Sequence, residues 1–401
     1  MRILRLLHRS SVREFCGGLN WGLAGRGVIV KDKAFQNLNS SQLYLHGATV
    51  AESLSGLAVY VRGNVTGEAC KISKPQFGKL LKQVTNHISS MSNIYVHDGA
   101  VGSSLKAGAK VRVISDSPSA VLSLSSILWG TPTRAVSHDS RPLTVYVATS
   151  ISPDIGDIIG LELKGENALI AADIERSSLV LCGNAFSDSN ATKQALAALS
   201  GPVIFARRGL PLSARLLVFG DSVLLLFAPE DTIKGCGDLL VPGDIGVILS
   251  SEAVAPLFQT GSSGSSNLFK LPAAVVLATF DSSGVIPSVS KLAPGQAAYH
   301  FLAGYQNGKF MPAYSKGPSS IDLLELAKEF LLKLKDDRIS SYLVNANGGE
   351  KGATGKDFAR LVESTLSNNI PPFQAKGGNL QDTYKSFLSS RFGEVPEEFS
   401  F

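Results

Sequence analysis

The hydrophobic pattern of the first half of the chain alternates between helical and strand periods. Apolar residues recur at helical spacing over 75–92, and a second helix is expected over 117–128. Glycine interrupts the apolar runs of 43–72, which therefore predict strands joined by turns. Further short strands are expected at 93–99, 110–115, 143–149, 168–173, 178–184 and 203–207. This succession predicts an α/β or α+β mixed sheet.

The second half of the chain begins with strands and ends with helices. Residues 214–250 consist almost entirely of apolar runs and turns, and the fully apolar run 273–281 ends at Asp281. Helices are expected over 319–335, with a serine N-cap, over 355–369 and from 378 onward, and a further buried strand over 341–347. The small polar stretch 260–267 predicts a flexible loop.

A length of 401 residues indicates one large domain or two fused ones. A targeting-like segment is expected over 1–27, and a helix with an extended tail is expected over 367–401. The tail contains Phe387, Phe392, Phe399 and Phe401. Because aromatic residues anchor interfaces, the tail is a candidate docking arm.

The positive charge is concentrated at the N-terminus. The chain has a net charge of +5, and five arginines, Arg2, Arg5, Arg9, Arg13 and Arg26, face a single acid before Asp32. Arginine with leucine and serine and few acids is typical of a mitochondrial transit peptide, which predicts a location in the mitochondrial matrix. A basic surface helix is the alternative. The nearly neutral remainder gives little indication of a nucleic-acid face.

The cysteines argue against a zinc site. Cys16, Cys70, Cys182 and Cys236 lie far apart, without a CxxC pair. Buried, reduced thiols are therefore expected. The apolar run 223–227 is far shorter than the roughly 20 residues of a membrane span, so a buried strand is expected there.

One segment has a specific resemblance. The sequence VVLATFDSSGVIPSVSKLAPGQAAYHFLAGY at 275–305 is similar to the D-x-x-G-V-L-P-P-V-S-K-L and Y-H-F-x-x-G-Y segments of the ATP-dependent phosphoenolpyruvate carboxykinases. Fainter collinear likeness extends over 43–366. The resemblance implies a shortened two-lobed α/β fold, with an N-terminal carboxykinase-like lobe over 28–208 and a C-terminal, degenerate nucleotide-binding lobe over 209–366. In the family, the cleft holds ATP with magnesium, and a second divalent metal that binds oxaloacetate or phosphoenolpyruvate.

The positions that match the family's substrate-binding residues differ in this chain. The family's T-G-R triplet corresponds to Thr66, Gly67 and Glu68, so an acid stands where a dicarboxylate would need an arginine. A tyrosine that precedes two lysines in the family corresponds to Phe186. The lysines correspond to Ala191 and Thr192, with Lys193 one position beyond.

The region that matches the phosphate loop has also changed. Residues 222–238, SVLLLFAPEDTIKGCGD, contain a strand and a Lys-Gly pair, but no glycine precedes Lys234, and Gly235 replaces the family's threonine. Glu230 and Asp231 stand where phosphates would lie. No histidine is present at 216–222, where the resemblance would place a ligand of the second metal. Of the metal-coordinating acids that follow the phosphate loop in the family, only one has a counterpart here, Asp244. The polar loop 260–267 replaces the family's N-T-R-A-x-Y-P segment.

These losses predict a pseudoenzyme with no catalytic, cofactor-binding or metal-binding residues, no cofactor and no small-molecule substrate. We expect a structural subunit of a large mitochondrial assembly, whose partners are other protein subunits, with ribosomal RNA as a further candidate. The mitochondrial ribosome comes first and a respiratory or ATP synthase complex second. A diverged active carboxykinase and a nucleotide-binding sensor are the alternatives.

The remaining site-like residues have structural interpretations. Asp281 is expected to cap a turn and Lys291 to be solvated, with a residual ligand site as the alternative. His300 is expected to pack in the core. The glycine-rich stretch 348–356 is a weak P-loop match. The pairs Arg207-Arg208 and Lys333-Lys335 are expected to form solvated faces.

Overall fold

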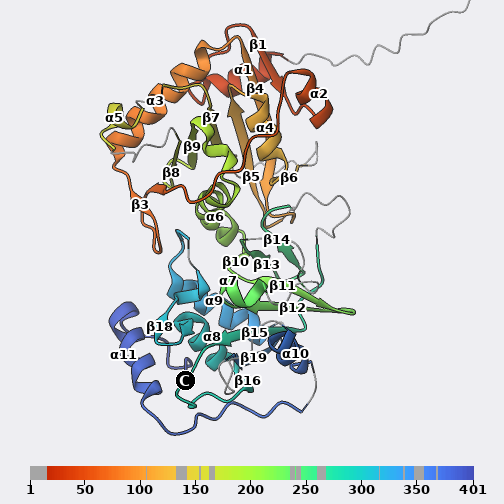
Figure 1. Cartoon of the computed structure of the whole chain (residues 1–401), viewed down its shortest axis with the longest axis vertical. Helices are drawn as coiled ribbons and strands as arrows, with labels where there is room; N and C mark the ends of the chain where they lie inside the picture. Colours follow the sequence, from red (N-terminus) through yellow and green to blue (C-terminus); the bar gives the residue numbers. More distant parts are fainter. Residues whose placement is uncertain are drawn as a thin grey trace, which may run out of the picture.

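The computed structural model describes residues 16–401, except 105, 132–141, 153–154, 162–167, 235–239, 241–244, 260–267, 316, 337–338, 347–355 and 367–368. Two lobes lie one above the other along the long axis of the molecule (Figure 1). Each lobe has its own mixed sheet, and a small third sheet lies between them. The mixed α/β fold expected from the sequence is confirmed.

The N-terminal lobe is built on a nine-stranded mixed sheet of order β1-β4-β5-β7-β9-β8-β2-β3, with β6 pairing with β4. Its strands are β1 (Lys33–Gln36), β2 (Val59–Arg62), β3 (Cys70–Lys71), β4 (Asn93–Val101), β5 (Ala109–Ser115), β6 (Trp129–Gly130), β7 (Leu143–Ala148), β8 (Leu169–Asp173) and β9 (Ser178–Cys182). The central strands β5, β7 and β9 are parallel, and β7 and β9 are buried on both faces, which explains their mainly apolar runs.

Helices cover both faces of this sheet. They are α1 (Cys16–Ala24), α2 (Ser40–Leu45), α3 (Lys74–Ser90), α4 (Pro118–Ser125), α5 (Ile155–Ile159) and α6 (Ser189–Ala206). On one face, α1, α3 and α5 pack with the sheet into a hydrophobic cluster that we call the α3 core. On the other face, α2, α4 and α6 form the α6 core. Alternate strand residues supply the two clusters, as the period of two requires.

The C-terminal lobe has a five-stranded sheet of order β11-β12-β15-β19-β16. Its strands are β11 (Arg215–Phe219), β12 (Ser222–Phe227), β15 (Ala274–Thr279), β16 (Val289–Leu292) and β19 (Ser340–Asn345), and a small hairpin joins β17 (Tyr305–Gln306) to β18 (Lys309–Phe310). The helices are α7 (Glu230–Lys234), α8 (Pro294–Ala303), α9 (Leu323–Asp336), α10 (Lys356–Ser364) and α11 (Leu380–Phe392). Helices α8, α9 and α11 pack on one face as the α8 core, and residues of α7 and α10 pack on the other.

A three-stranded sheet joins the lobes. It consists of β10 (Leu210–Leu212), β13 (Val247–Leu249) and β14 (Val254–Pro256). On β13, Val247 and Leu249 belong to the α8 core, whereas Ile248 between them belongs to the α6 core. Because successive strand residues face opposite ways, one strand is packed into both lobes.

Three secondary-structure predictions are wrong. Residues 203–207, predicted as a strand, form the end of α6, which continues past Pro202 because Ile204 is buried in the α6 core. Residues 43–45, predicted within strands, lie in α2, whose N-cap Asn39 forms a capping box with Gln42. The helix expected over 319–335 begins at Leu323, and its first amides donate to Asp322 rather than to a serine.

The predicted targeting segment is only partly described, since residues 1–15 lie outside the described part. Residues 16–27 pack on the N-terminal lobe: Leu23 is fully buried in the α3 core, and the Arg26 carbonyl accepts a hydrogen bond from the Tyr146 hydroxyl at 2.9 Å. The part of the chain that the structure describes contains no helix long and apolar enough to cross a membrane.

The C-terminal tail folds back onto its own lobe. Phe399 is buried in the α8 core, and Phe387, Phe392 and Phe401 pack against that core. Glu398 forms an ion pair with Lys335 at 2.8 Å, so Lys335 is not simply solvated. The docking arm predicted for the tail is therefore wrong, because its aromatic rings are used within the lobe.

The cysteines only partly match expectation. Cys182 is buried, and burial raises its pKa to about 12, which keeps the thiol protonated and unreactive. Cys70 is exposed on the edge strand β3, contrary to the prediction of buried thiols. The thiols of Cys16 and Cys236 lie outside the described part of the structure.

Truncation of Ile248 tests the importance of the junction. Ile248 is 1% exposed and packs against Gly102 and Gly209, where any β-carbon would collide with it. We expect Ile248→Ala to destabilise the protein by about 2–5 kcal/mol. Chemical denaturation followed by fluorescence of Trp129, whose Nε1 donates to the Pro256 carbonyl at 3.1 Å, measures the loss.

The matched control is Leu332→Ala on α9, since Leu332 is 48% exposed. This control should change stability by less than about 0.5 kcal/mol. Equal denaturation midpoints for Ile248→Ala and the unmodified chain would contradict the role given to the junction.

Candidate functional site

A cavity of about 670 Å³ lies between the lobes. The N-terminal lobe supplies the first turns of α6 and the segment 53–55, and the C-terminal lobe supplies 211–215 and 317–321. Many of the lining residues carry hydroxyl groups: Ser53, Ser55, Ser189, Ser213, Ser315, Ser319 and Ser320. The main chains of Thr66 and Ser319 exchange two hydrogen bonds of 2.8 Å, which join the lobes near the cavity.

The N-terminus of α6, which borders this cavity, is capped by a carboxylate of the chain itself. Asp188 is fully buried, and its Oδ1 accepts a hydrogen bond from the Ala191 amide at 2.9 Å. Its Oδ2 accepts from the Leu57 amide at 3.0 Å, and the Ser187 carbonyl accepts from the Leu54 amide at 3.3 Å. Asp188 therefore occupies an anion position and also holds the segment 53–57 at the cavity.

Two basic residues line the cavity. Lys193 on α6 is only 7% exposed, so the residue one position beyond the family's lysines does reach this space. Arg215 on β11 donates to Glu230 at 3.0 Å, and this pair brings a carboxylate to the start of α7. Sequence patterns do not identify Asp188 or Arg215 as cavity residues, although an aspartate before an alanine-rich run is an N-cap signal.

The other positions that match the family's site lie elsewhere or outside the described residues. Glu68 is exposed and is not among the cavity-lining residues. Phe186 is buried in the α6 core, together with Ala191. Thr192 is fully buried on α6. The side chains of Asp231 and Lys234, the loop 235–239, Asp244, and the stretches 260–267 and 348–355 lie outside the described residues.

Asp281 and Lys291 behave as expected for structural residues. Asp281 is 1% exposed, and its carboxylate accepts hydrogen bonds from the Ser283 amide and the Ile286 amide, both at 2.8 Å. Lys291 is exposed on β16. The turn-capping role is confirmed for Asp281, whose carboxylate stabilises the turn of the D-x-x-G segment.

The predicted solvated arginine pair is half wrong. Arg208 is exposed, but Arg207 donates from Nη1 to the Gly108 carbonyl at 2.6 Å. Arg207 therefore ties the end of α6 to the turn that precedes β5.

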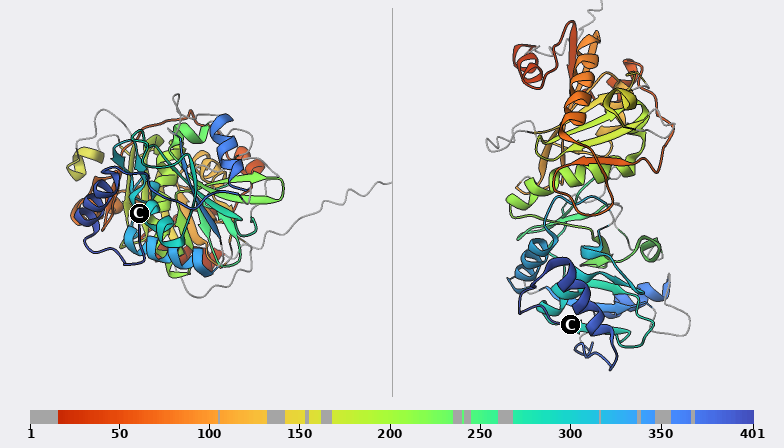
Figure 2. Two further views of the ribbon diagram at one scale, coloured as in Figure 1. Left: turned by 90° about the horizontal axis from the view of Figure 1, so that it is seen from below. Right: turned by 90° about the vertical axis from the view of Figure 1, so that its left-hand side faces the viewer.

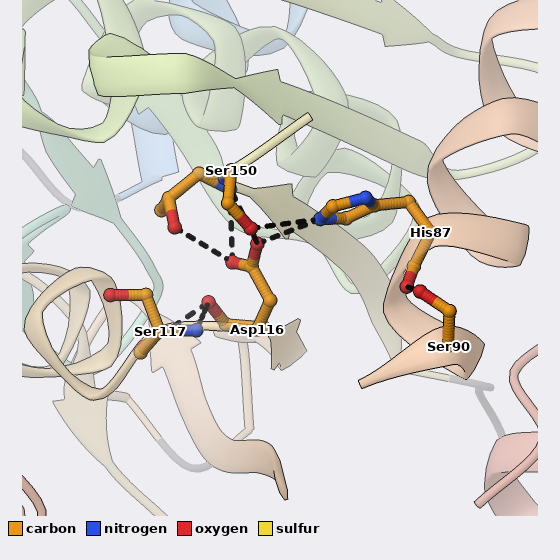
Figure 3. Close-up of polar contacts among 7 residues, drawn as sticks. His87, Ser90, Asp116, Ser117 and Ser150 are labelled. Atoms are coloured by element: carbon orange, nitrogen blue, oxygen red, sulfur yellow. Dashed lines mark hydrogen bonds and ion pairs between the residues drawn. The ribbon is translucent and has the colours of Figure 1, made fainter. Parts of the chain in front are cut away.

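A histidine, an aspartate and a serine meet at the carboxyl ends of β5 and β7 (Figure 3). His87 Nε2 lies 3.1 Å from Asp116 Oδ2 and 3.1 Å from Ser150 Oγ, and the Ser150 hydroxyl donates to Asp116 at 3.0 Å. A catalytic triad places the histidine between serine and acid, with one ring nitrogen for each. Here both contact the same nitrogen, so the arrangement does not activate the serine.

The role of this cluster is to join elements. Asp116 is 1% exposed and also accepts from the Thr149 amide at 2.9 Å and the Ser150 amide at 3.1 Å. Its carboxylate thus ties β5 to the chain after β7, while His87 attaches α3 to the same point.

His300 on α8 is 1% exposed and is enclosed by aromatic rings (Phe373, Tyr384 and Phe401, with centroids 5.3 Å from its own). Neither ring nitrogen has a hydrogen-bond partner among the described residues. Burial lowers its pKa to about 3, so the ring is neutral. The packed core histidine expected from the sequence is confirmed.

Fold and cavity together define a two-lobed α/β protein with a polar cavity between its lobes. Residues 252–310 match the model of the family described as phosphoenolpyruvate carboxykinase, of the ATP-dependent type. Among curated proteins, the ATP-dependent phosphoenolpyruvate carboxykinase of Leptospira biflexa is 29% identical over 119 residues, which is 25% of this chain and 22% of that protein. The corresponding protein of Flavobacterium johnsoniae is 34% identical over 62 residues, 16% and 12% of the two chains.

Over part of its length the chain is therefore similar to the ATP-dependent phosphoenolpyruvate carboxykinases. The matched segment includes β15, β16 and α8, which build the centre of the C-terminal lobe. The alignments span about a fifth of the length or less of the relatives (22% and 12%).

The groups that this family implies, ATP with magnesium and a second divalent metal, do not fit the described cavity. Carboxylates stand at both helix starts that border it, the buried Asp188 at α6 and the half-exposed Glu230 at α7, and like charge repels phosphate. The described residues contain no group of three or more histidine, cysteine or acidic side chains that could hold a metal ion.

Because His300 is buried in its neutral form, we expect the stability of the folded protein to depend on pH. The folded pKa of His300, about 3, lies below the ordinary value of 6.5, so at intermediate pH the unfolded chain binds a proton that the folded chain does not. Stability therefore falls as the pH is lowered below 6.5. The contribution lost by pH 5 is about 2 kcal/mol. Denaturation of the unmodified chain and of His300→Phe at pH 7 and pH 5 measures it.

Tyr384→Phe is the control, because it alters the same aromatic cluster without removing the histidine. It should keep the pH dependence that His300→Phe loses. A His300→Phe variant with the unmodified pH dependence would contradict the assignment.

Proposed function

We propose that this protein is a non-catalytic member of the carboxykinase family and acts as a structural subunit of a large assembly in the mitochondrial matrix. The mitochondrial ribosome is the first candidate, and a respiratory or ATP synthase complex is the second. The N-terminal composition of arginine, leucine and serine supports the location.

The observation that carries this proposal is that the carboxylates at the cavity are already paired with groups of the chain. Asp188 accepts hydrogen bonds from two main-chain amides, and Glu230 pairs with Arg215, so two carboxylates of the chain stand at the edge of the cavity. An anionic nucleotide or dicarboxylate would have to compete with them in a partly enclosed space. Independently of the cavity, Glu68 stands at the sequence position that matches the family's substrate arginine, so no arginine is supplied there.

Sedimentation of the tagged full chain in mitochondrial extract tests the assembly. We expect the protein to migrate with a heavy particle rather than as a free monomer. Ribonuclease treatment before sedimentation distinguishes a ribosome, whose particle collapses, from a respiratory or ATP synthase complex, whose position is retained. Migration as a monomer or small oligomer would contradict the proposal.

A second candidate function is small-molecule binding in the cavity, because the buried Lys193 reaches it. Calorimetry of the purified full chain with magnesium ATP, magnesium ADP and oxaloacetate decides between the two. We expect no heat of binding and no turnover of oxaloacetate with ATP and manganese. Binding heat that Lys193→Met abolishes would establish a sensor instead, and turnover would establish a diverged enzyme.

A further inference from the structure

The outer strand of the large N-terminal sheet has main-chain groups directed away from the sheet. Strand β1 is the terminal strand in the sheet order, and it pairs in parallel with β4. The Lys33 amide donates to the Ser92 carbonyl at 3.1 Å and the Asn37 amide to the Val96 carbonyl at 2.8 Å. Because alternate residues point opposite ways, the amides and carbonyls of Ala34 and Gln36 face outward.

The other sheet edges carry features that discourage further pairing. Strand β3 has two residues, β10 contains Pro211, β14 pairs with Phe269, β11 pairs with Leu240, and β16 is flanked by 371–373. Within the described part of the chain, β1 has no such pairing on its outer side, and its one charged residue, Lys33, is at its first position. Edge strand β1 is thus a template for a further strand.

Exposed apolar side chains are concentrated in the segments on both sides of β1. Trp21 and Ile29 before the strand are 80% and 58% exposed, and Leu45 and Val50 after it are 88% and 81% exposed. Helix α1 packs in the α3 core and α2 in the α6 core, so the two segments lie on opposite faces of the sheet. Strand β1 and helices α1 and α2 lie together at the end of the N-terminal lobe farthest from the C-terminal lobe (Figures 1 and 2).

The chemistry of this edge specifies its occupant. Outward amides and carbonyls in a strand are satisfied by another extended polypeptide, whose alternating side chains would meet the apolar residues of both faces. Lys31 and Lys33 are exposed around a single acid, Asp32, which favours an acidic residue at the start of the incoming strand.

We propose that β1 is a docking edge that accepts an extended, mainly apolar segment of another protein subunit by strand addition. This inference rests on the proposed function as a subunit, and it names the surface that makes the contact.

The variant Ala34→Pro tests it in the full chain. Proline removes the outward amide but no bond to β4, so the fold should be kept, as circular dichroism and Trp129 fluorescence would verify. We expect the assembly-bound fraction to fall about tenfold at limiting protein. Leu45→Asp should act in the same way, whereas Leu332→Asp, which alters an exposed leucine of the other lobe, should have no effect.

Hydrogen exchange provides a second measurement that does not depend on a variant. The Ala34 and Gln36 amides should exchange rapidly in the purified chain and at least about tenfold more slowly in the isolated assembly. Unchanged exchange, or normal incorporation of Ala34→Pro and Leu45→Asp, would overturn the docking edge while the sedimenting protein still supported the proposed function.

Two other occupants are outcomes of the same test. Slow exchange in the purified chain with concentration-dependent dimerisation would identify a second copy on β1 and overturn the proposal. Slow exchange in a purified monomer, lost on deletion of residues 1–15, would identify the chain's own N-terminus and also overturn it. A protein that never sediments in a heavy particle would instead overturn the proposed function itself.

Discussion

Strand β13 is the element on which the arrangement of this protein depends. Its alternating side chains are buried in two different cores, with Ile248 in the N-terminal lobe and Val247 and Leu249 in the C-terminal lobe. Gly102 and Gly209 allow close approach at this point, because a larger residue would collide with Ile248. The lobes are therefore joined by apolar side chains buried between them. Directional hydrogen bonds between Thr66 and Ser319 and between Trp129 and Pro256 add to this packing.

This joint determines the character of the cavity. Helix α6 packs its apolar face into the N-terminal core and presents its first turns to the space between the lobes. The positive end of such a helix attracts an anion, and in this chain Asp188 is that anion. Arg215 is likewise paired with a carboxylate of the chain, that of Glu230. The N-terminus of α6 and Arg215 could each attract a nucleotide or dicarboxylate, but in this chain both are paired with the chain's own carboxylates.

The segment that matches the family model builds the centre of the C-terminal lobe. Strand β15 and helix α8 carry the matched sequence, and their side chains form much of the C-terminal core: Asp281 fixes a turn, and His300 is packed among aromatic rings that include the C-terminal Phe401. The turn at Asp281 and the packing of His300 stabilise the fold of the C-terminal lobe. The docking edge proposed at β1 lies in the other lobe, outside the matched segment.

Hydrophobic periodicity predicted most strands of both sheets and the helices α3, α4, α10 and α11, because each depends on neighbouring residues. The sequence also located the family segment, whose residues are contiguous. It could not assign 203–207 to α6, since burial of Ile204 overrides local strand propensity there. Nor could it bring Asp188 to the Leu57 amide, Arg215 to Glu230, or Phe401 to His300, because those contacts join distant residues. Tertiary structure alone decided that the tail packs inward, that Lys193 reaches the cavity and that β1 is a sheet edge, since each requires the lobes to be folded.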